Sequence, residues 1–181
     1  LTIRFYNWQG DWLSVGYHQT KIPSHWEKMA DDGTIKIIRR PSGGGAVLHS
    51  NGITYALTFK KSSYKNLSYA MVNNWLMRSF KELGLNLRTG HDKKSTIKQN
   101  CFGTAYLSDL IDDEGFKRIG SAQYRKKDGF LQHGEIQINP SRSLWFKLFG
   151  EEAPPKIDLN LTNEAIIEYL TNSFLEDKSN L

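Results

Sequence analysis

Hydrophobic and polar positions alternate strictly over residues 53–59, where large apolar side chains are separated by threonine and alanine. A period of two places one face of a strand on a core. Shorter β-rich runs, bounded by turn residues, predict strands at 3–8, 13–17 and 35–39, with a short helix at 25–30 after Pro23-Ser24.

The period then changes to that of a helix. Apolar residues recur at helical spacing from Val72 to Leu83, and Gly84 stands where a C-terminal capping glycine belongs. This predicts a helix over 68–83. The polar stretch 88–98 predicts a loop.

The second half mixes strands and helices without regular strand–helix–strand alternation. Residues 124–129, which end in Asp128-Gly129, predict a hairpin turn. Thr162 is placed to cap a final helix with an apolar stripe from Ile166 to Phe174. Further segments are predicted as strands at 107–110, 116–122 and 135–138 and as a helix at 145–149. We therefore expect an α+β fold, a mixed β-sheet flanked by helices.

The composition changes this picture little. The chain has 181 residues, with 39% hydrophobic and 24% charged, which fits one domain over 1–181 with a real core. No apolar run approaches the roughly 20 residues of a membrane span. The net charge is +5, but the basic pairs are scattered and no nucleic-acid recognition motif accompanies them. An acidic protein partner or a phosphate-bearing ligand fits the charge, and we expect neither nucleic acid nor membrane as a partner.

Cys101 is the single cysteine, so an internal disulfide or a multi-cysteine zinc cluster is excluded. The histidines are scattered, and we expect no metal site. The first eight residues lack the pattern of a signal peptide. A free thiol without a targeting segment favours a cytoplasmic protein.

The densest chemical pattern is the run 39–49, Arg-Arg-Pro-Ser-Gly-Gly-Gly-Ala-Val-Leu-His. Three consecutive glycines let the backbone approach a ligand closely. Arg39 and Arg40 can pair with a phosphate or carboxylate. The run lacks the Gly-Lys-Ser/Thr ending of a nucleotide-binding P-loop. The alternative is a flexible turn with two solvated arginines and a histidine that satisfies backbone groups.

Three further features are candidates for a role in binding or catalysis. The small residues Gly120-Ser121-Ala122 leave room for a ligand against a sheet, and Lys117 can point into that space or lie solvated at an edge. Cys101 precedes Lys117 by 16 residues, and a nearby ammonium would lower the thiol pKa and favour the nucleophilic thiolate. The alternative for Cys101 is a small buried side chain. His133 before Gly134 can build a site or satisfy backbone groups.

Together, the segments 39–49, 117–123 and 132–136 resemble the lipoate–protein ligase and octanoyltransferase family, which is related in fold to biotin–protein ligases. The resemblance extends to 4–8 and 13–17 and covers roughly residues 3–140. The pair Cys101-Phe102 is similar to the cysteine-dependent octanoyltransferase branch.

This resemblance implies an acyl-binding tunnel under the glycine loop. Cys101 would take an octanoyl group as a thioester from acyl carrier protein, and Lys117 would contact the acyl carbonyl. The acyl group would pass to a lysine of a lipoyl-domain or glycine-cleavage H-type acceptor without a cofactor. The residues implied in acyl or ligand binding are Arg39, Arg40, Ser42, Gly43, Gly44, Gly45, Ala46, His49, Gly120, Ser121, Ala122, His133 and Gly134.

Two other interpretations stay open. An ATP-dependent lipoate–protein ligase would use free lipoate or octanoate with ATP and Mg, and a biotin ligase is a variant of this reading. A non-catalytic acyl-binding homologue is the other. The sequence departs from the family pattern at Ser50, where an acidic residue is common in the ligases, and at Glu135, where a small hydroxyl residue is usual. We also expect the family's opening helix and its accessory C-terminal domain to be lacking, and the second absence favours a transferase.

Overall fold

The computed structural model describes residues 1–60, 69–90 and 108–178. The strands are β1 (Thr2–Tyr6), β2 (Trp12–Val15), β3 (Lys36–Arg39), β4 (Val47–His49), β5 (Ile53–Lys60), β6 (Leu87–Thr89), β7 (Leu110–Asp112), β8 (Lys117–Lys126) and β9 (Gly129–Ile136). The helices are α1 (Ser24–Asp31), α2 (Tyr69–Glu82), α3 (Arg142–Phe149) and α4 (Asn163–Lys178).

Two sheets form the frame of the molecule. The larger has six strands in the order β1-β5-β9-β8-β7-β6, and every neighbouring pair in it is antiparallel. The smaller has the order β3-β2-β4, with β2 parallel to β3 and antiparallel to β4. The predicted α+β class is confirmed, and mixed pairing is found in the smaller sheet.

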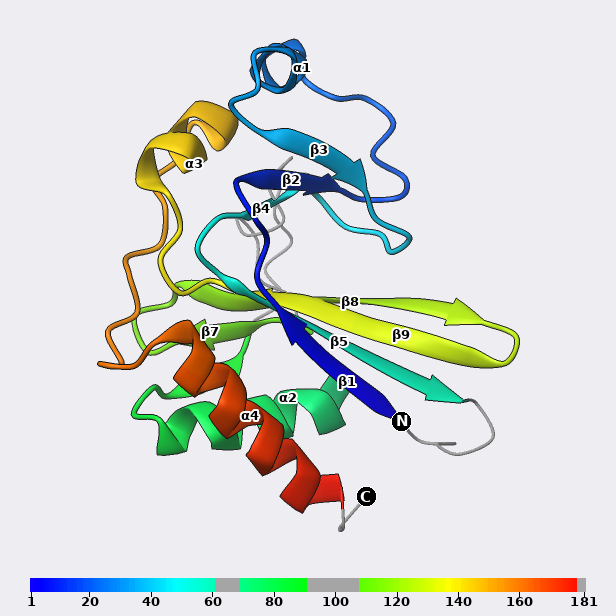
Figure 1. Ribbon diagram of the computed structural model, residues 1–181, viewed down its shortest axis with the longest axis vertical. Helices are drawn as coiled ribbons and strands as arrows, with labels where there is room; N and C mark the ends of the chain where they lie inside the picture. Colours follow the sequence, from blue (N-terminus) through cyan, green and yellow to red (C-terminus); the bar gives the residue numbers. More distant parts are fainter. Residues whose placement is uncertain (61–68, 91–107, 179–181) are drawn as a thin grey trace.

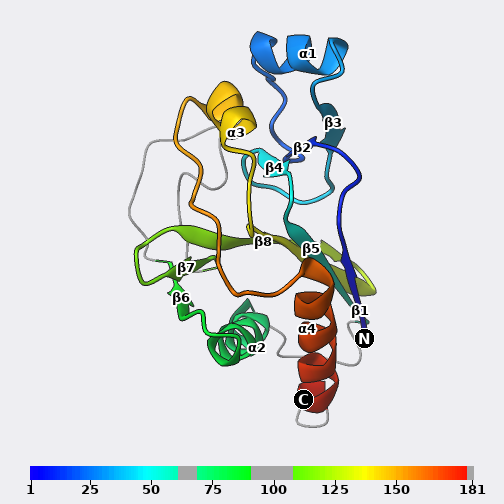
Figure 2. The ribbon, with the colours of Figure 1, turned by 60° about the vertical axis from the view of Figure 1, so that its left-hand side comes forward.

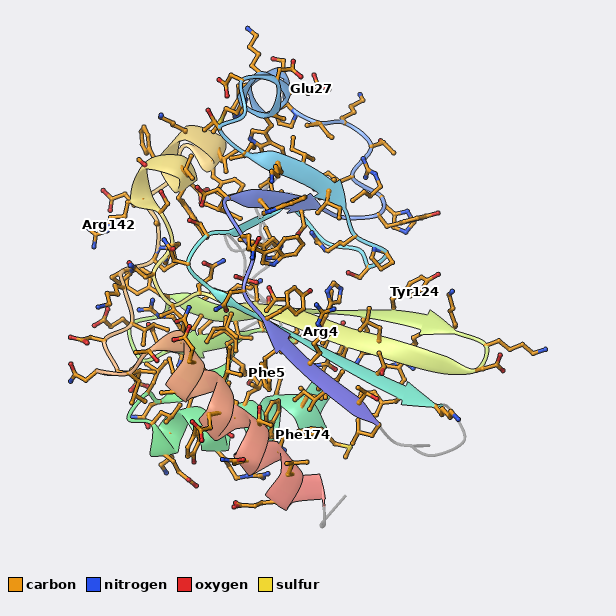
Figure 3. The ribbon with its side chains drawn as sticks, viewed as in Figure 1. Arg4, Phe5, Glu27, Tyr124, Arg142 and Phe174 are labelled. Carbon is orange, nitrogen blue, oxygen red and sulfur yellow. The ribbon has the colours of Figure 1, made fainter. Side chains whose placement is uncertain are left out.

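Each sheet packs on its own pair of helices. In Figures 1 and 2, α2 and α4 lie on one side of the large sheet, and α1 and α3 lie beside the small sheet at the opposite end of the molecule. Figure 3 shows Phe5 and Phe174 between β1 and α4, where both rings contact Trp75. Beside the small sheet, the Trp26 indole of α1 is fully buried and donates a 2.8 Å hydrogen bond to the Leu148 carbonyl of α3. The two cores leave a space between the sheets, and that space contains the site.

Two predicted helix ends agree with the structure, whereas the helix predicted over 145–149 begins earlier, at Arg142. Gly84 follows α2 with a φ of +93°, the left-handed conformation typical of a capping glycine. The Thr162 hydroxyl accepts a 3.2 Å hydrogen bond from the Ala165 amide at the start of α4, as expected of a cap. No helix in the described ranges is long and apolar enough to cross a bilayer.

Several predicted segments differ from the structure in extent, among them the strands predicted at 107–110 and 135–138, which are found as β7 and β9. β8 and β9 run on to pair Lys126 with Gly129, so only residues 127 and 128 form the turn that we expected over 124–129. Strand β6 occupies Leu87–Thr89, where the loop prediction began. The remainder of that loop, from 91 to 98, lies outside the described residues.

Candidate functional site

A cavity of about 260 Å³ lies where the small sheet meets the large one. Strands from both sheets contribute to its wall: β2, β3 and β4 from the small sheet and β1, β5, β8 and β9 from the large one. Most of the wall is carbon. Its apolar members are Trp8, Ile38, Pro41, Val47, Ala56, Ala122 and Leu131, and its polar and small members are Tyr6, Ser14, Arg39, Arg40, His49, Thr54, Gly120, Ser121, His133, Gly134 and Glu135.

Small residues on β8 and β9 create part of this space. Gly120, Ser121 and Ala122 line the cavity, as the sequence predicts. Gly134 pairs with Ser121 across the two strands. A Cβ atom at Gly134 would lie only 2.6 Å from the Tyr55 ring and from the Gly120 carbonyl oxygen, so this position needs a glycine.

Arg39 and Arg40 fix the glycine loop and its surroundings. The Arg40 guanidinium donates hydrogen bonds to the carbonyls of Gly43 at 2.8 Å and Gly45 at 2.6 Å, and to Ser14 O at 2.9 Å. Arg39 donates to Gly16 O at 2.8 Å. The sequence suggested that both arginines face an anion. In the structure they bind backbone carbonyls, because arginine offers five donors in a planar fork that can satisfy several acceptors.

His133 connects β9 to the same loop. Its Nε2 lies 2.6 Å from Ser42 Oγ. Burial, and then the charges of Arg40 and His49, lower the pKa of His133 from 6.5 to about 4, so the ring is neutral at pH 7. Ala46, the last small residue of the loop, is fully buried in the core beside the small sheet. The loop is therefore anchored at both its ends.

A polar network occupies one wall of the cavity. His49 Nδ1 lies 2.7 Å from Glu135 Oε2, and His49 Nε2 lies 2.8 Å from Ser14 Oγ. Thr54 donates its hydroxyl hydrogen to the same carboxylate oxygen of Glu135. The Trp8 indole stacks on the His49 ring at 4.6 Å between centroids and donates a 2.8 Å hydrogen bond to Thr54. Glu135 is thus the acceptor at the centre of this network.

Lys117 is buried and held by an acid, and it is not among the residues that line this cavity. Its Nζ lies 2.7 Å from Asp109 Oδ2, and both side chains are only 3% exposed. The other oxygen of that carboxylate accepts a 3.4 Å hydrogen bond from the Ser121 amide. The Asp109 carboxylate therefore links the Lys117 ammonium to the backbone of Ser121, which lines the cavity. The solvated-lysine alternative does not hold for this structure.

A second, more polar cavity of about 690 Å³ shares Pro41 with the first. Its wall includes Ser42 and Gly43 of the glycine loop and Arg125 of β8. Tyr124, also in this wall, stands on the face of β8 that looks toward the small sheet (Figure 3). The start of the glycine loop thus borders both the apolar cavity and this more polar chamber.

Cys101 lies outside the described residues. Most of the other predicted residues converge: eight of them line the apolar cavity, and Ser42 and Gly43 line its polar neighbour. Sequence reasoning missed Ser14, Trp8, Thr54 and Asp109. Ser14 had one available indication, as a hydroxyl residue in an otherwise apolar strand. In the described ranges, no cluster of three histidine, cysteine or acidic residues is arranged to hold a metal.

Comparison with known proteins gives one family. The lipoyl protein ligase A/B catalytic domain matches residues 1–164. Octanoyltransferase LipM of Halalkalibacterium halodurans is 29% identical over 181 aligned residues, which cover 91% of this chain and 65% of the relative. The same enzyme of Brevibacillus brevis is 34% identical over 161 residues, covering 81% of this chain and 58% of the relative. The chain therefore spans about three-fifths of the length of these relatives.

Solved structures agree on the fold. A lipoate protein ligase of T. acidophilum with bound lipoic acid superposes with a TM-score of 0.76 at 19% identity, covering 96% of this chain and 70% of that one. A lipoate-protein ligase A bound with ATP gives 0.70 at 20% identity, covering 96% and 71%.

Proposed function

This chain belongs to the lipoyl protein ligase A/B catalytic domain family, and from that premise we propose that it is an octanoyl or lipoyl transferase. Its donor is an acylated carrier protein. Its acceptor is a lysine of a lipoyl-domain or glycine-cleavage H-type protein. The octanoyltransferases among its relatives support acyl transfer as the reaction.

The observation that carries the proposal is the apolar cavity between the sheets. An apolar protein cavity of ~150 Å³ accommodates benzene, a six-carbon ring. The cavity here is about 260 Å³, which suits an eight-carbon chain. Trp8, Val47 and Leu131 offer carbon surface, and each methylene removed from water contributes about 0.8 kcal/mol. The polar chamber beyond Pro41 offers space for the polar group that links the acyl chain to the carrier protein.

In the first step, the Cys101 thiolate attacks the thioester carbonyl of the donor. The new C–S bond forms, the bond to the carrier's sulfur breaks, and the released thiolate takes up a proton from water. Lys117 contributes positive charge where the carbonyl oxygen becomes negative. The Asp109 carboxylate that binds this ammonium also accepts a hydrogen bond from the Ser121 amide of the cavity wall. The roles of Cys101 and Lys117 rest on the sequence resemblance.

In the second step, the amine of the acceptor lysine attacks the acyl-cysteine. The C–N bond of the amide forms, the C–S bond breaks, and the amine proton passes to the Cys101 sulfur or to solvent. Splitting one transfer into two easier steps is the gain of covalent catalysis. No nucleotide takes part.

The net charge of +5 suits acidic carrier and acceptor proteins. Opposite charges accelerate the encounter of two proteins, and salt screens this attraction.

The test of the proposed function is a reconstituted transfer. Octanoyl-carrier protein, a lipoyl domain and this protein are mixed without ATP, and the acceptor is weighed by mass spectrometry. The proposal expects an octanoylated acceptor lysine. An unmodified acceptor, with donor and acceptor both shown to be competent with another transferase, would contradict it.

The polar chamber favours a second candidate, an ATP-dependent lipoate ligase. Arg125, His18 and the glycine loop surround this chamber, and such groups suit a phosphate-bearing ligand with Mg. Lipoate-dependent exchange of pyrophosphate into ATP distinguishes the two, because a transferase has no adenylate intermediate. Acyl binding without either reaction would instead indicate a non-catalytic homologue.

A further inference from the structure

Three side chains on the cavity wall form a continuous hydrogen-bonded chain. Ser14 Oγ lies 2.8 Å from His49 Nε2, and His49 Nδ1 lies 2.7 Å from Glu135 Oε2. The three come from three strands, β2, β4 and β9, and all line the same apolar cavity. A hydroxyl, an imidazole and a carboxylate in this order and at these distances are the geometry of a hydrolytic triad.

The hydrogen-bond chemistry assigns the protons. An ionised carboxylate only accepts hydrogen bonds, so His49 donates from Nδ1 to Glu135. Its Nε2 then carries the lone pair and accepts the hydrogen of the Ser14 hydroxyl. Thr54 also donates to Glu135, and the Trp8 ring stacks on the imidazole. These contacts fix the carboxylate and the plane of the His49 ring, as a general base requires.

We propose that Ser14, His49 and Glu135 are a second catalytic centre, which hydrolyses medium-chain acyl esters or thioesters through an acyl-serine. Ser14 Oγ bonds to the acyl carbonyl carbon while its proton passes to His49 Nε2. The carbon–oxygen or carbon–sulfur bond to the leaving group breaks, and the leaving group takes that proton. Water then attacks the carbonyl carbon of the acyl-serine while His49 Nε2 takes its proton. The bond between that carbon and Ser14 Oγ breaks, His49 returns the proton to Ser14 Oγ, and a free carboxylic acid is released.

Arg40 strengthens this assignment. Its Nη1 lies 3.3 Å from Ser14 Oγ and 2.9 Å from Ser14 O. A guanidinium at this place favours an oxygen that gains negative charge as the tetrahedral intermediate forms. The centre uses neither Cys101 nor Lys117, so it stands independently of the proposed transferase.

The experiment separates the two activities. All variants are made in the Cys101→Ala protein, and hydrolysis of p-nitrophenyl octanoate and of an octanoyl thioester is measured. We expect Ser14→Ala to lower hydrolysis by at least roughly 100-fold, because the nucleophile is removed, and Glu135→Gln to lower it as well. Ser50→Ala is the matched control. Ser50 is as buried as Ser14, each being 3% exposed, and its hydroxyl is not hydrogen-bonded, so hydrolysis should be unchanged.

A covalent readout complements the rates. A fluorophosphonate should label the Cys101→Ala protein on the peptide that contains Ser14, and Ser14→Ala should abolish the label. Equal hydrolysis in Ser14→Ala and its parent, or a protein that the probe leaves unlabelled, would overturn the proposal. If Ser14→Ala does not fold, labelling of the parent decides the matter alone. Absence of acyl transfer by the unsubstituted protein, with the Ser14 label intact, would count against the transferase and not against this centre.

Discussion

His133 Nε2 lies 2.6 Å from Ser42 Oγ, so one hydrogen bond joins strand β9 to the glycine loop over 91 residues of sequence. The ring is half-buried near Arg40, and its pKa is lowered from 6.5 to about 4. Burial and a neighbouring cation both disfavour the charged form. The contact between sheet and loop is therefore made by a neutral histidine.

This pKa makes stability depend on pH. Between pH 6.5 and about 4 the unfolded chain binds a proton at His133 that the folded chain does not, so stability falls as pH drops through this window. At ~1.4 kcal/mol per pKa unit, the loss from pH 7 to pH 5 is about 2 kcal/mol. Urea unfolding at both pH values should show it. His133→Gln keeps a hydrogen-bonding group and does not titrate, and an equal loss in that variant would contradict the account.

Gly52 is expected to reject even one methyl group. A Cβ there would lie 2.2 Å from Glu135 Oε1 and 2.8 Å from the Ile136 carbonyl oxygen. The carboxylate can move, but the strand backbone cannot. Gly52→Ala should therefore cost about 1–3 kcal/mol in urea unfolding. Gly43→Ala is the control, since nothing lies within 4 Å of its Cβ position. Equal unfolding free energies for the two variants would show that the packing around Gly52 is looser than described.

Lys117 and Asp109 should be coupled in stability as well as in position. Their 2.7 Å ion pair is buried, and removal of one partner leaves an uncompensated charge that costs about 3–5 kcal/mol. Lys117→Met and Asp109→Asn should each destabilise the protein, while the double variant should lose less than the sum of the two. A double-mutant cycle in urea measures this coupling, and strictly additive losses would argue against the pair.

The volume of the cavity should set acyl chain length. Ala122 lines its wall, and Ala122→Leu would fill part of the space. We expect preference to shift toward shorter chains, with about fourfold loss of affinity for each methylene excluded, from ~0.8 kcal/mol per methylene. Binding of hexanoate, octanoate and decanoate by calorimetry tests this. Ala70→Leu on the exposed face of α2 is the control. A similar shift in that variant would show that the volume of the cavity does not set the preferred chain length.

Much of the fold follows from local patterns. The period of 3.6 residues between Val72 and Leu83, with Gly84 after it, placed α2 to within a residue at each end. The β8–β9 hairpin was predicted too short. Residues 124–126 are mostly polar and lack an apolar alternation, and pairing with the partner strand keeps them extended.

The sequence predicted which residues belong to the site better than it predicted which of them contact one another. Gly120 and His133 belong to recognisable motifs and do line the cavity. The partners of Arg40 and His49 are non-local: Ser14 lies 26 residues from Arg40, and Glu135 lies 86 residues from His49. Such contacts depend on how two sheets meet, which the pattern along one strand does not contain.

The central claim is that acyl transfer passes through Cys101. Its most direct test is the intact mass of the protein after brief incubation with octanoyl-carrier protein, without an acceptor. We predict one octanoyl adduct, located on Cys101 by peptide mapping, absent in Cys101→Ala, and discharged when a lipoyl domain is added. Full transfer to the lipoyl domain by Cys101→Ala would contradict the claim.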